Sequence, residues 1–379
     1  MNRSLHVLAL SAWYPSRVHP TLGNFVQRHL KAAAKYHRIS LVAAIGTDQA
    51  EIPKSEIEDS GNFLEIRVYY KNGKFRHLEA FRALRQGFRI LRKLRPEKPN
   101  LIHGNILVPG AWQILYASFV FNVPCIVSEH WTGFTRKDGP NWSSLQEKLA
   151  KRISRKAAFL LPVSAHLQRA MESHGLSGRY KVVPNVVNTS VFIPGEHVAP
   201  PFRVLHISSL VEEHKNTRGF LRVFARFREA FPDSVLEIIS DGPSEDCLEY
   251  ARELKIGNSL IINTFKPAEF VAERMAASHV LLLFSHVENL PCVIMEALSC
   301  GVPVISSRVG GIGEHIDSSK GILVEPGDET ALLMALKEIA SGSRTFNARE
   351  LRRYAIDNFS MEAVGNQLDE IYRLALNQA

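Results

Sequence analysis

Two glutamates, Glu288 and Glu296, stand in the chain with seven residues between them. An apolar run ends near Ser285, and Pro291 is placed to begin a helix that Gly301 ends. This pattern predicts Glu288 in a loop between strand and helix, and Glu296 inside the helix. Carboxylates there can accept hydrogen bonds from sugar or ribose hydroxyls, and the free N–H groups of the helix start attract a phosphate.

A plainer explanation competes for each glutamate alone. A glutamate ahead of a helix often only caps it, and a glutamate inside a helix usually faces water. Apolar neighbours such as Met295 and Ala297 flank Glu296, however, so a freely solvated helix face does not fit this segment well. The two residues together favour a binding site more than either does alone.

A lysine occupies a similar place earlier in the chain. The segment 207–216 ends an apolar strand and leads into a helix with Phe220, Phe224 and Phe227 on one face. Lys215 therefore stands at a helix start, where its ammonium group can neutralise a diphosphate leaving group. Taken alone, a lysine there is more often solvated surface.

In the N-terminal half, polar residues and a glycine follow apolar strands. His130 comes directly after the strand 124–128, and a histidine at such a place is structural about as often as functional. His103 and Asn105 follow the strand that begins at Leu101, and they are further candidates for contact with an acceptor. Gly23 lies in the loop after the first strand, where a glycine by itself indicates only a turn.

The segment 288–316, ENLPCVIMEALSCGVPVISSRVGGIGEHI, resembles a family signature over almost its whole length. It is similar to that of the retaining glycosyltransferases of the GT-B fold, of the group 1 or family 4 type, which carry a Glu-x7-Glu motif. The resemblance implies that Glu288 lies beside the donor sugar and that Glu296 binds the ribose. It implies further donor contacts from Lys215 to the diphosphate and from Gly23, Asn289, Leu290, Gly311 and Ile312, and it makes His130 a catalytic candidate that contacts the donor sugar.

The resemblance also implies a mechanism. Transfer would retain the anomeric configuration by attack on the same face, with the donor phosphate accepting the proton of the acceptor, so that Glu288 need not be a covalent nucleophile. The sequence departs from the family at one position, because Ser209 stands where an arginine is common, six residues before the lysine. The diphosphate would then be held by fewer positive charges.

The elements that must position these residues alternate between apolar strands and helical patterns, which predicts parallel sheets built from βαβ units. The expected strands are 5–10, 39–44, 63–69, 101–103, 124–128, 159–163, 203–207, 235–239, 260–262, 280–284 and 302–306. We expect an α/β protein of two Rossmann-like, doubly wound domains that face each other across a cleft. The expected parts are an acceptor-side domain (1–190), a linker (191–201), a nucleotide-sugar domain (202–360) and a C-terminal helix (361–379) that returns to the first domain.

Several classes of protein are excluded by missing motifs. The chain has no G-x-G-x-x-G, typical of dinucleotide oxidoreductases, and no G-x-x-x-x-G-K-[ST], typical of P-loop NTPases. It also has no D-x-D pair, so we expect no metal site, no divalent cation and no cofactor beyond the sugar nucleotide. The four cysteines show no C-x-x-C spacing and are typical of reduced thiols, and no apolar run is long enough to predict a membrane span.

The charge is divided unevenly along the chain. Residues 1–195 hold 28 Lys and Arg against 12 Asp and Glu, a net charge of +16, whereas residues 196–379 hold 18 against 26, a net charge of −8. The basic helical segment 78–95 is either a solvated domain helix or a surface that docks on anionic lipid. The pattern favours a cytoplasmic protein, peripheral on the inner membrane face, with a glycan or polyprenyl-diphosphate-linked acceptor for cell-surface polysaccharide, and no nucleic-acid partner.

Two other functions fit the same sequence. A nucleotide-sugar epimerase can use this fold but would convert the donor without an acceptor. A non-catalytic sugar-nucleotide-binding module is the other alternative, against which the intact Glu288, Glu296 and Lys215 argue.

Overall fold

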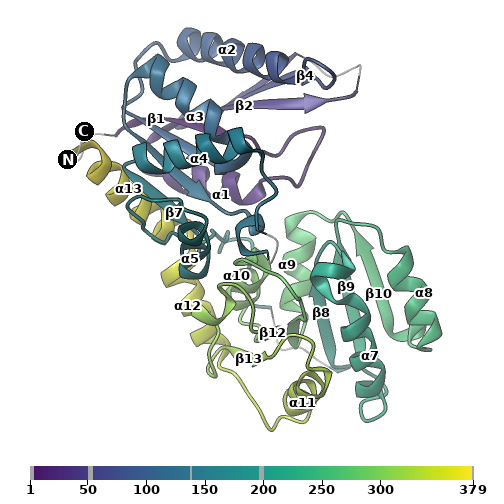
Figure 1. Ribbon diagram of the computed structural model, residues 1–379. Helices are drawn as coiled ribbons and strands as arrows, with labels where there is room; N and C mark the ends of the chain where they lie inside the picture. Colours follow the sequence, from purple (N-terminus) through teal and green to yellow (C-terminus); the bar gives the residue numbers. More distant parts are fainter. Residues whose placement is uncertain (1–3, 50–53, 137–138, 196–199, 378–379) are drawn as a thin grey trace. The chain divides into compact units, whose positions relative to one another are not determined.

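The computed structural model describes residues 4–49, 54–136, 139–195 and 200–377. The chain divides into two compact units (Figure 1). The first unit comprises residues 1–186 and 361–379, and the second comprises residues 187–360. The boundary thus falls just before the predicted linker 191–201, of which residues 196–199 lie outside the described part of the chain.

The first unit contains a seven-stranded sheet in the order β3-β4-β2-β1-β5-β6-β7. All neighbouring strands are parallel except β3, which pairs antiparallel with β4 at the edge. The strands are β1 (His6–Ser11), β2 (Arg38–Thr47), β3 (Ser55–Asp59), β4 (Phe63–Lys71), β5 (Leu101–Asn105), β6 (Cys125–Glu129) and β7 (Phe159–Pro162). Most of these strands are buried along their whole length, because helices cover both faces of a parallel sheet.

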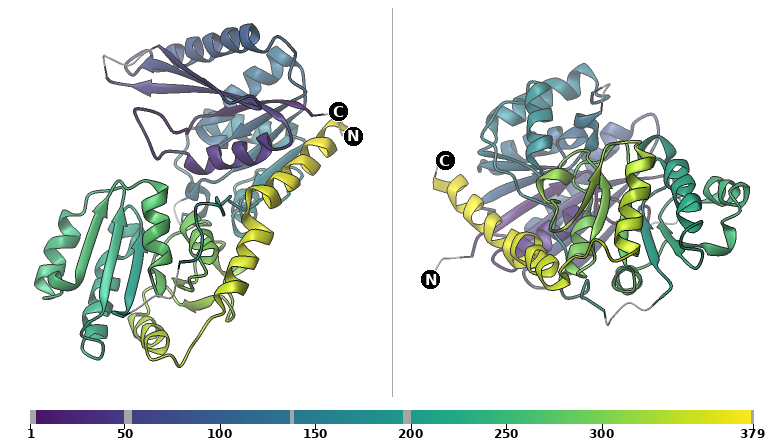
Figure 2. Two further views of the ribbon diagram at one scale, coloured as in Figure 1. Left: turned by 180° about the vertical axis from the view of Figure 1, so that it is seen from behind. Right: turned by 90° about the horizontal axis from the view of Figure 1, so that it is seen from below.

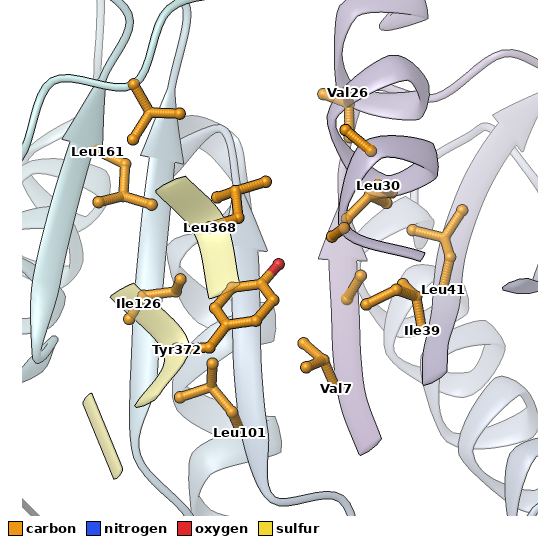
Figure 3. Packing of buried hydrophobic residues seen from close by; sticks show 14 of the residues in the cluster. Val7, Val26, Leu30, Ile39, Leu41, Leu101, Ile126, Leu161, Leu368 and Tyr372 are labelled. Atoms are coloured by element: carbon orange, nitrogen blue, oxygen red, sulfur yellow. The ribbon is translucent and has the colours of Figure 1, made fainter. Parts of the chain in front are cut away.

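Helices of the first unit pack on the two faces of this sheet. On one face, α1 (Asn24–Ala34) and α13 (Met361–Asn377) enclose a core in which Leu368 and Tyr372 meet strand residues such as Leu101 and Ile126 (Figure 3). The helix α13, drawn in yellow in Figure 2, packs beside α1. The carboxylate of Asp369 lies 2.9 Å from His37 Nε2, which ties this helix to the end of α1.

The other face is covered by α2 (Arg76–Leu94) and α3 (Leu107–Phe121), with α4 (Ser144–Lys156) packed against α3. Gly87 in α2 permits this close approach, because a Cβ there would lie 2.4 Å from Val42 Cγ1 of β2. A short 3-10 helix (Thr132–Thr135) and α5 (Ala165–Ser173) complete the unit.

The second unit contains a six-stranded parallel sheet in the order β10-β9-β8-β11-β12-β13. The strands are β8 (Arg203–Ile207), β9 (Val235–Ser240), β10 (Leu260–Thr264), β11 (Val280–Leu283), β12 (Val304–Ser307) and β13 (Gly321–Val324). The helices are α6 (Glu212–Lys215), α7 (Thr217–Arg228), α8 (Glu245–Glu253), α9 (Ala268–Ala276), α10 (Cys292–Ser299), α11 (Glu329–Ala340) and α12 (Ala348–Phe359), with short 3-10 turns at Gly257–Ser259 and Ile312–Glu314. The predicted phenylalanine face of α7 lies in the core of this unit, with Phe220, Phe224 and Phe227 all fully buried.

Both sheets have the doubly wound strand order, in which the strands first follow one another to one side of the first strand and then continue on its other side. The α/β class of two Rossmann-like domains is therefore confirmed. Two of the described strands were not predicted: β3 is largely exposed at the edge of the first sheet, and β13 is only partly buried at the edge of the second. Within the described residues, none of the helices is both long enough and apolar enough to pass through a bilayer.

Candidate functional site

The point at which the strand order reverses in the second unit lies between β8 and β11. In open parallel sheets, ligands bind in the crevice at the carboxyl ends of strands at such a point. The connection after β8 carries Lys215, the last residue of the short helix α6, and the loop after β11 carries Glu288. The topology therefore brings together two residues that are 73 positions apart in the sequence.

Three side chains meet at this point. Lys215 Nζ donates to Glu288 Oε1 at 2.5 Å, and Ser285 Oγ donates to the same oxygen at 2.8 Å. The side chain of Lys215 is 18% exposed and that of Glu288 is 8% exposed. The carboxylate is therefore fixed from two sides, while the ammonium group retains N–H donors that can reach a ligand.

Backbone hydrogen bonds hold the two loops together. The N–H groups of His286 and Val287 donate to the carbonyl oxygen of His214, at 2.8 and 3.3 Å. His206 supports the same place from the core, with Nδ1 2.8 Å from the Leu282 oxygen and Nε2 2.7 Å from Ser208 Oγ. Burial, followed by the charge of Lys215, lowers the pKa of His206 to about 4. This histidine is therefore neutral near pH 7.

The loop after β12, which contains Gly310 and Gly311, touches the backbone of Glu288 directly. Gly310 has φ +59°, and a Cβ there would lie 2.3 Å from the Glu288 carbonyl oxygen and 2.6 Å from that of Asn289. The N–H of Gly311 donates to the Asn289 oxygen at 2.7 Å. A glycine is therefore required at position 310 for this close approach. Gly310 was not among the candidates selected from the sequence.

We expect Gly310→Ala to disturb the site much more than Gly327→Ala. Both glycines have a positive φ, so both replacements incur strain of roughly 1–2 kcal/mol. Only at Gly310 does the new methyl group meet backbone, since nothing lies within 4 Å of a Cβ at Gly327. Urea unfolding should show an additional loss of about 1–3 kcal/mol for Gly310→Ala, and calorimetry should show weaker nucleotide binding. Equal losses in the two variants would contradict this assignment.

The remaining donor candidates of the second unit lie around these loops. Glu296 is buried within α10, and Asn289, Leu290 and Ile312 are also buried. A buried carboxylate on α10 agrees with the apolar neighbours seen in the sequence. The contacts of these residues and of Gly311 with a ligand stay predictions.

Ser209, at the position where the family commonly has an arginine, lines a cavity of about 290 Å³. Arg218 of α7 lines the same cavity, and its guanidinium group lies 4.6 Å from the centre of the Tyr250 ring. Acidic groups, Glu245 and Asp246, line it too. The cavity therefore presents mixed charge where the family places one cation.

In the first unit, His130 lies beyond the carboxyl end of β6. Its Nδ1 is 3.0 Å from Asn185 Oδ1, and its ring packs on Phe25 and on His29, with ring centres 4.6 and 4.9 Å apart. Burial, with a smaller effect from His29, lowers the pKa of His130 well below its ordinary value. The ring is neutral near pH 7, and the contact with Asn185 Oδ1 assigns its proton to Nδ1.

The residue before it, Glu129, is a buried carboxylate that organises this loop. Its Oε1 accepts hydrogen bonds from the N–H groups of His130 and Trp131, at 2.8 and 2.9 Å, and its Oε2 accepts from that of Leu107 at 2.8 Å. Burial raises the pKa of Glu129 to about 7, although the three N–H groups act in the opposite direction. Glu129 therefore fixes the backbone at the ends of β5 and β6.

The sequence placed the two acceptor candidates after a strand, whereas the structure places both of them inside β5. His103 is fully buried, with Nδ1 2.8 Å from the Tyr372 hydroxyl and Nε2 2.8 Å from Ser128 Oγ. Burial lowers its pKa to about 3. Asn105 is also buried, and its Nδ2 donates to the carbonyl oxygens of Leu10 and His103. Both ring nitrogens of His103 are engaged inside the core, so this residue offers no atom to an acceptor in this structure.

Gly23 is the N-cap residue just before α1 and has φ +75°. A Cβ at this position would lie 2.4 Å from the Trp13 carbonyl oxygen. The glycine is therefore required for the loop after β1 to pack against the helix start. Its predicted contact with a donor phosphate is a separate matter and stays a prediction.

Four residues of these sites were not selected from the sequence: Glu129, Asn185, Ser285 and Gly310. Asn185 lies within the predicted first domain (1–190), in a Pro-containing stretch in which no candidate residue was selected. Ser285 and Gly310 stand inside or beside the quoted motif, so their spacing to Glu288 was the available signal. Only the tertiary contacts show what each of them does.

Two known families match the chain. Residues 22–191 match the family described as Glycosyltransferase Family 4, and residues 194–358 match the family described as Glycosyl transferases group 1. Together the two matches span most of both units.

Individual proteins are similar over different lengths. N-acetyl-alpha-D-glucosaminyl L-malate synthase of Bacillus anthracis is 32% identical over 174 residues, which are 45% of this chain and 44% of that protein. GDP-mannose-dependent alpha-(1-6)-phosphatidylinositol monomannoside mannosyltransferase of Mycolicibacterium smegmatis is 27% identical over 254 residues, which are 61% of this chain and 66% of that protein. This chain thus spans less than two thirds of the length of each of these relatives.

The crystal structure of Anabaena Alr3699/HepE in complex with UDP superposes with a TM-score of 0.73 over 97% of this chain and 99% of that chain, at 19% sequence identity. At this level of identity the likeness shows the GT-B fold alone.

Proposed function

Because this chain belongs to the glycosyltransferases of group 1 and family 4, we propose that it is a retaining enzyme that uses a nucleoside-diphosphate sugar. The sugar would pass to a hydroxyl group of a glycan or of a lipid-linked acceptor in the synthesis of a cell-surface polysaccharide. The observation that carries this proposal is the cluster of Lys215, Glu288 and Ser285 at the reversal point of the second sheet.

In the proposed reaction, the bond between the anomeric carbon and the donor phosphate oxygen breaks, and the oxygen leaves with the electron pair. The acceptor hydroxyl attacks the same face of the sugar, and its proton passes to the departing phosphate. The ammonium group of Lys215 stabilises the negative charge that develops on the diphosphate. The carboxylate of Glu288, held by Ser285, stabilises the positive charge that develops on the sugar ring.

The first unit supplies the acceptor side in this proposal. His130 contacts the donor sugar as a neutral ring, because its lowered pKa keeps it uncharged near pH 7. Glu129 positions the His130 backbone but has no direct part in the reaction.

Two observations support the general assignment of a sugar nucleotide and a lipid: one solved neighbour is a complex with UDP, and one relative is named for GDP-mannose and a phosphatidylinositol mannoside.

The proposal includes activity without a divalent cation. The chain has no D-x-D pair, and Lys215 provides a positive charge at the place where the diphosphate would leave. Transfer should therefore persist in excess chelator. Loss of activity in chelator that manganese restores would contradict this part.

Thermal unfolding in the presence of UDP, GDP, ADP and their common sugars tests the donor site. A ligand at about a hundred times its Kd adds about 2.7 kcal/mol of stability, which raises the Tm by roughly 5–10 °C. We expect one nucleotide to stabilise the wild-type chain and to lose this effect in Lys215→Ala. No shift with any nucleotide would contradict the proposal. In a separate activity assay, conversion of the donor in the absence of an acceptor would indicate an epimerase.

Lys320→Ala is the matched control for this experiment. Lys320 is also a shielded lysine of the second unit, 12% exposed and paired with Asp317, but it contacts Tyr354 instead of the loops after β8 and β11. This variant should keep the shift with nucleotide. If both variants lost it equally, the effect would reflect stability and not donor binding.

A further inference from the structure

A cavity of about 630 Å³ lies in the first unit between α2, α3 and α4, which Figure 1 labels. Its volume falls within the range of about 300–1,000 Å³ that is typical of sites for small molecules. Apolar side chains form most of the walls, and two basic side chains stand at the start of α2. The residues that line it are Arg76, His77, Phe81, Leu107, Val108, Pro109, Ala111, Trp112, Ser143, Leu145, Gln146 and Leu149.

The walls of this cavity are held in place by the core. Leu107 and Ala111 are buried, and Phe81 packs edge-on against Tyr116 of α3 with ring centres 4.9 Å apart. Two polar groups of the wall, on Ser143 and Gln146, already bond within the start of α4, since Ser143 Oγ accepts from the Gln146 N–H and Gln146 Oε1 accepts from the Ser143 N–H. A sugar would therefore lose hydrogen bonds on entering, whereas a hydrocarbon chain would gain burial.

The cavity shares a buried group with the loop that carries His130. The N–H of Leu107, which lines the cavity, donates to one oxygen of Glu129. The other oxygen of Glu129 accepts from the N–H groups of His130 and Trp131. The wall of the cavity and the candidate catalytic loop are therefore joined through a single carboxylate.

The surface around the cavity is both apolar and basic. Phe75 is 67% exposed, Leu78 is 47% exposed and Leu145 is 66% exposed. Arg76 of the cavity wall is exposed, and further exposed arginines continue along α2 away from the cavity, at Arg82, Arg85, Arg89 and Arg92. An amphiphile with an anionic head and a hydrocarbon chain matches this combination of charge and apolar surface.

We propose that this cavity binds the hydrocarbon chain of a lipid-linked acceptor, with Arg76 pairing with the acceptor's phosphate and the glycan directed toward the His130 loop. The inference rests on the proposed function, because it specifies the acceptor for the same reaction. It commits to the acceptor lipid as the occupant, so bulk phospholipid and a protein partner are outcomes that would contradict it.

Farnesyl diphosphate, a single isoprenoid chain with an anionic head, is the probe for this site, and titration calorimetry with the full chain gives its Kd. We expect Leu145→Asp to weaken binding by about ten- to a hundredfold, because it replaces an apolar wall with a carboxylate. Phe119→Asp is the matched control: Phe119 is 84% exposed on α3, outside the cavity, and the change removes apolar surface and adds the same charge. This control should bind farnesyl diphosphate as the wild type does.

Two further ligands separate the alternatives. Inorganic pyrophosphate should bind at least about tenfold more weakly than farnesyl diphosphate, because it lacks the chain. Equal binding of the two ligands, or equal loss in Leu145→Asp and Phe119→Asp, would overturn the proposal. So would a result in which Leu145→Asp reduces binding only to vesicles of phosphatidylglycerol, which would make this surface a general membrane contact.

The titration with farnesyl diphosphate and the thermal-shift test with nucleotides can fail independently of each other. Binding of farnesyl diphosphate requires neither the donor nor sugar transfer, so it can be absent while nucleotide still stabilises the chain. In that case the cavity proposal fails and the donor site stands. Leu145→Asp should also keep the thermal shift with nucleotide, which shows that the variant is folded.

Discussion

Lys215→Ala is expected to lower kcat for sugar transfer by about 10²–10⁴-fold. In the proposed reaction, the departing diphosphate develops negative charge at the carboxyl ends of β8 and β11, where the ammonium group of Lys215 lies beside Glu288. Without the ammonium group, that charge must form next to a carboxylate. The measurement is the initial rate of nucleoside diphosphate release from whichever donor stabilises the chain, with a lipid-linked glycan as the acceptor.

The control and a second variant sharpen this result. Lys320→Ala should keep kcat within about twofold, because the ion pair of Lys320 with the exposed Asp317 lies outside the site. Glu288→Gln keeps groups that can bond to Ser285 and Lys215 but removes the negative charge. Because Lys215 and Glu288 are hydrogen-bonded to each other and act together in the proposed reaction, the double variant should lose much less than the product of the two single losses. A full kcat in Lys215→Ala would remove this residue from the mechanism.

Mild acid is expected to destabilise the second unit by roughly 2 kcal/mol between pH 6.5 and pH 5, through His206 alone. The pKa of His206 is about 4 in the folded chain, because of burial and then Lys215, against 6.5 for the ordinary side chain. Between these two values the unfolded chain binds a proton that the folded chain does not. The stability is therefore fully present above about pH 6.5 and is lost as the pH falls toward 4. Burial also lowers the pKa of His315, which acts in the same direction.

Hydrogen exchange measured on peptides from β8 and β9 follows this unit separately from the first. The variant His206→Asn removes the titrating group, so its protection should be lower at every pH but should fall less steeply with acid. An unchanged slope in the variant would contradict the assignment.

The first unit contains groups with opposite effects. The lowered pKa of His103 makes the stability of this unit fall with acid, whereas the raised pKa of Glu129 makes the stability rise as the pH falls from about 7 toward the ordinary pKa of a glutamate.

The sequence by itself determined the class of fold and most of its elements. Buried parallel strands are continuous apolar runs, so eleven strands could be located from their apolar composition and from the glycines and prolines that lie between them. The edge strand β3 was missed because its residues are mostly charged and exposed. The local pattern around Pro291 and Gly301 also gave α10 correctly, since helix ends depend on residues nearby in the sequence.

Only the tertiary structure decided which of the candidate residues share a site. Lys215 and Glu288 lie on the connections after two strands that become neighbours through the doubly wound order, and no local pattern encodes that neighbourhood. His103 and His130 both look like residues at strand ends in the sequence. In the structure, however, His103 lies inside β5 and is enclosed by Tyr372 of the last helix, while His130 follows β6 and meets Asn185. Gly310 is needed because another loop's backbone passes within van der Waals distance. Strand and helix formation depend on near neighbours in the chain, whereas burial and pairing of a side chain depend on segments that only the folded sheet brings together.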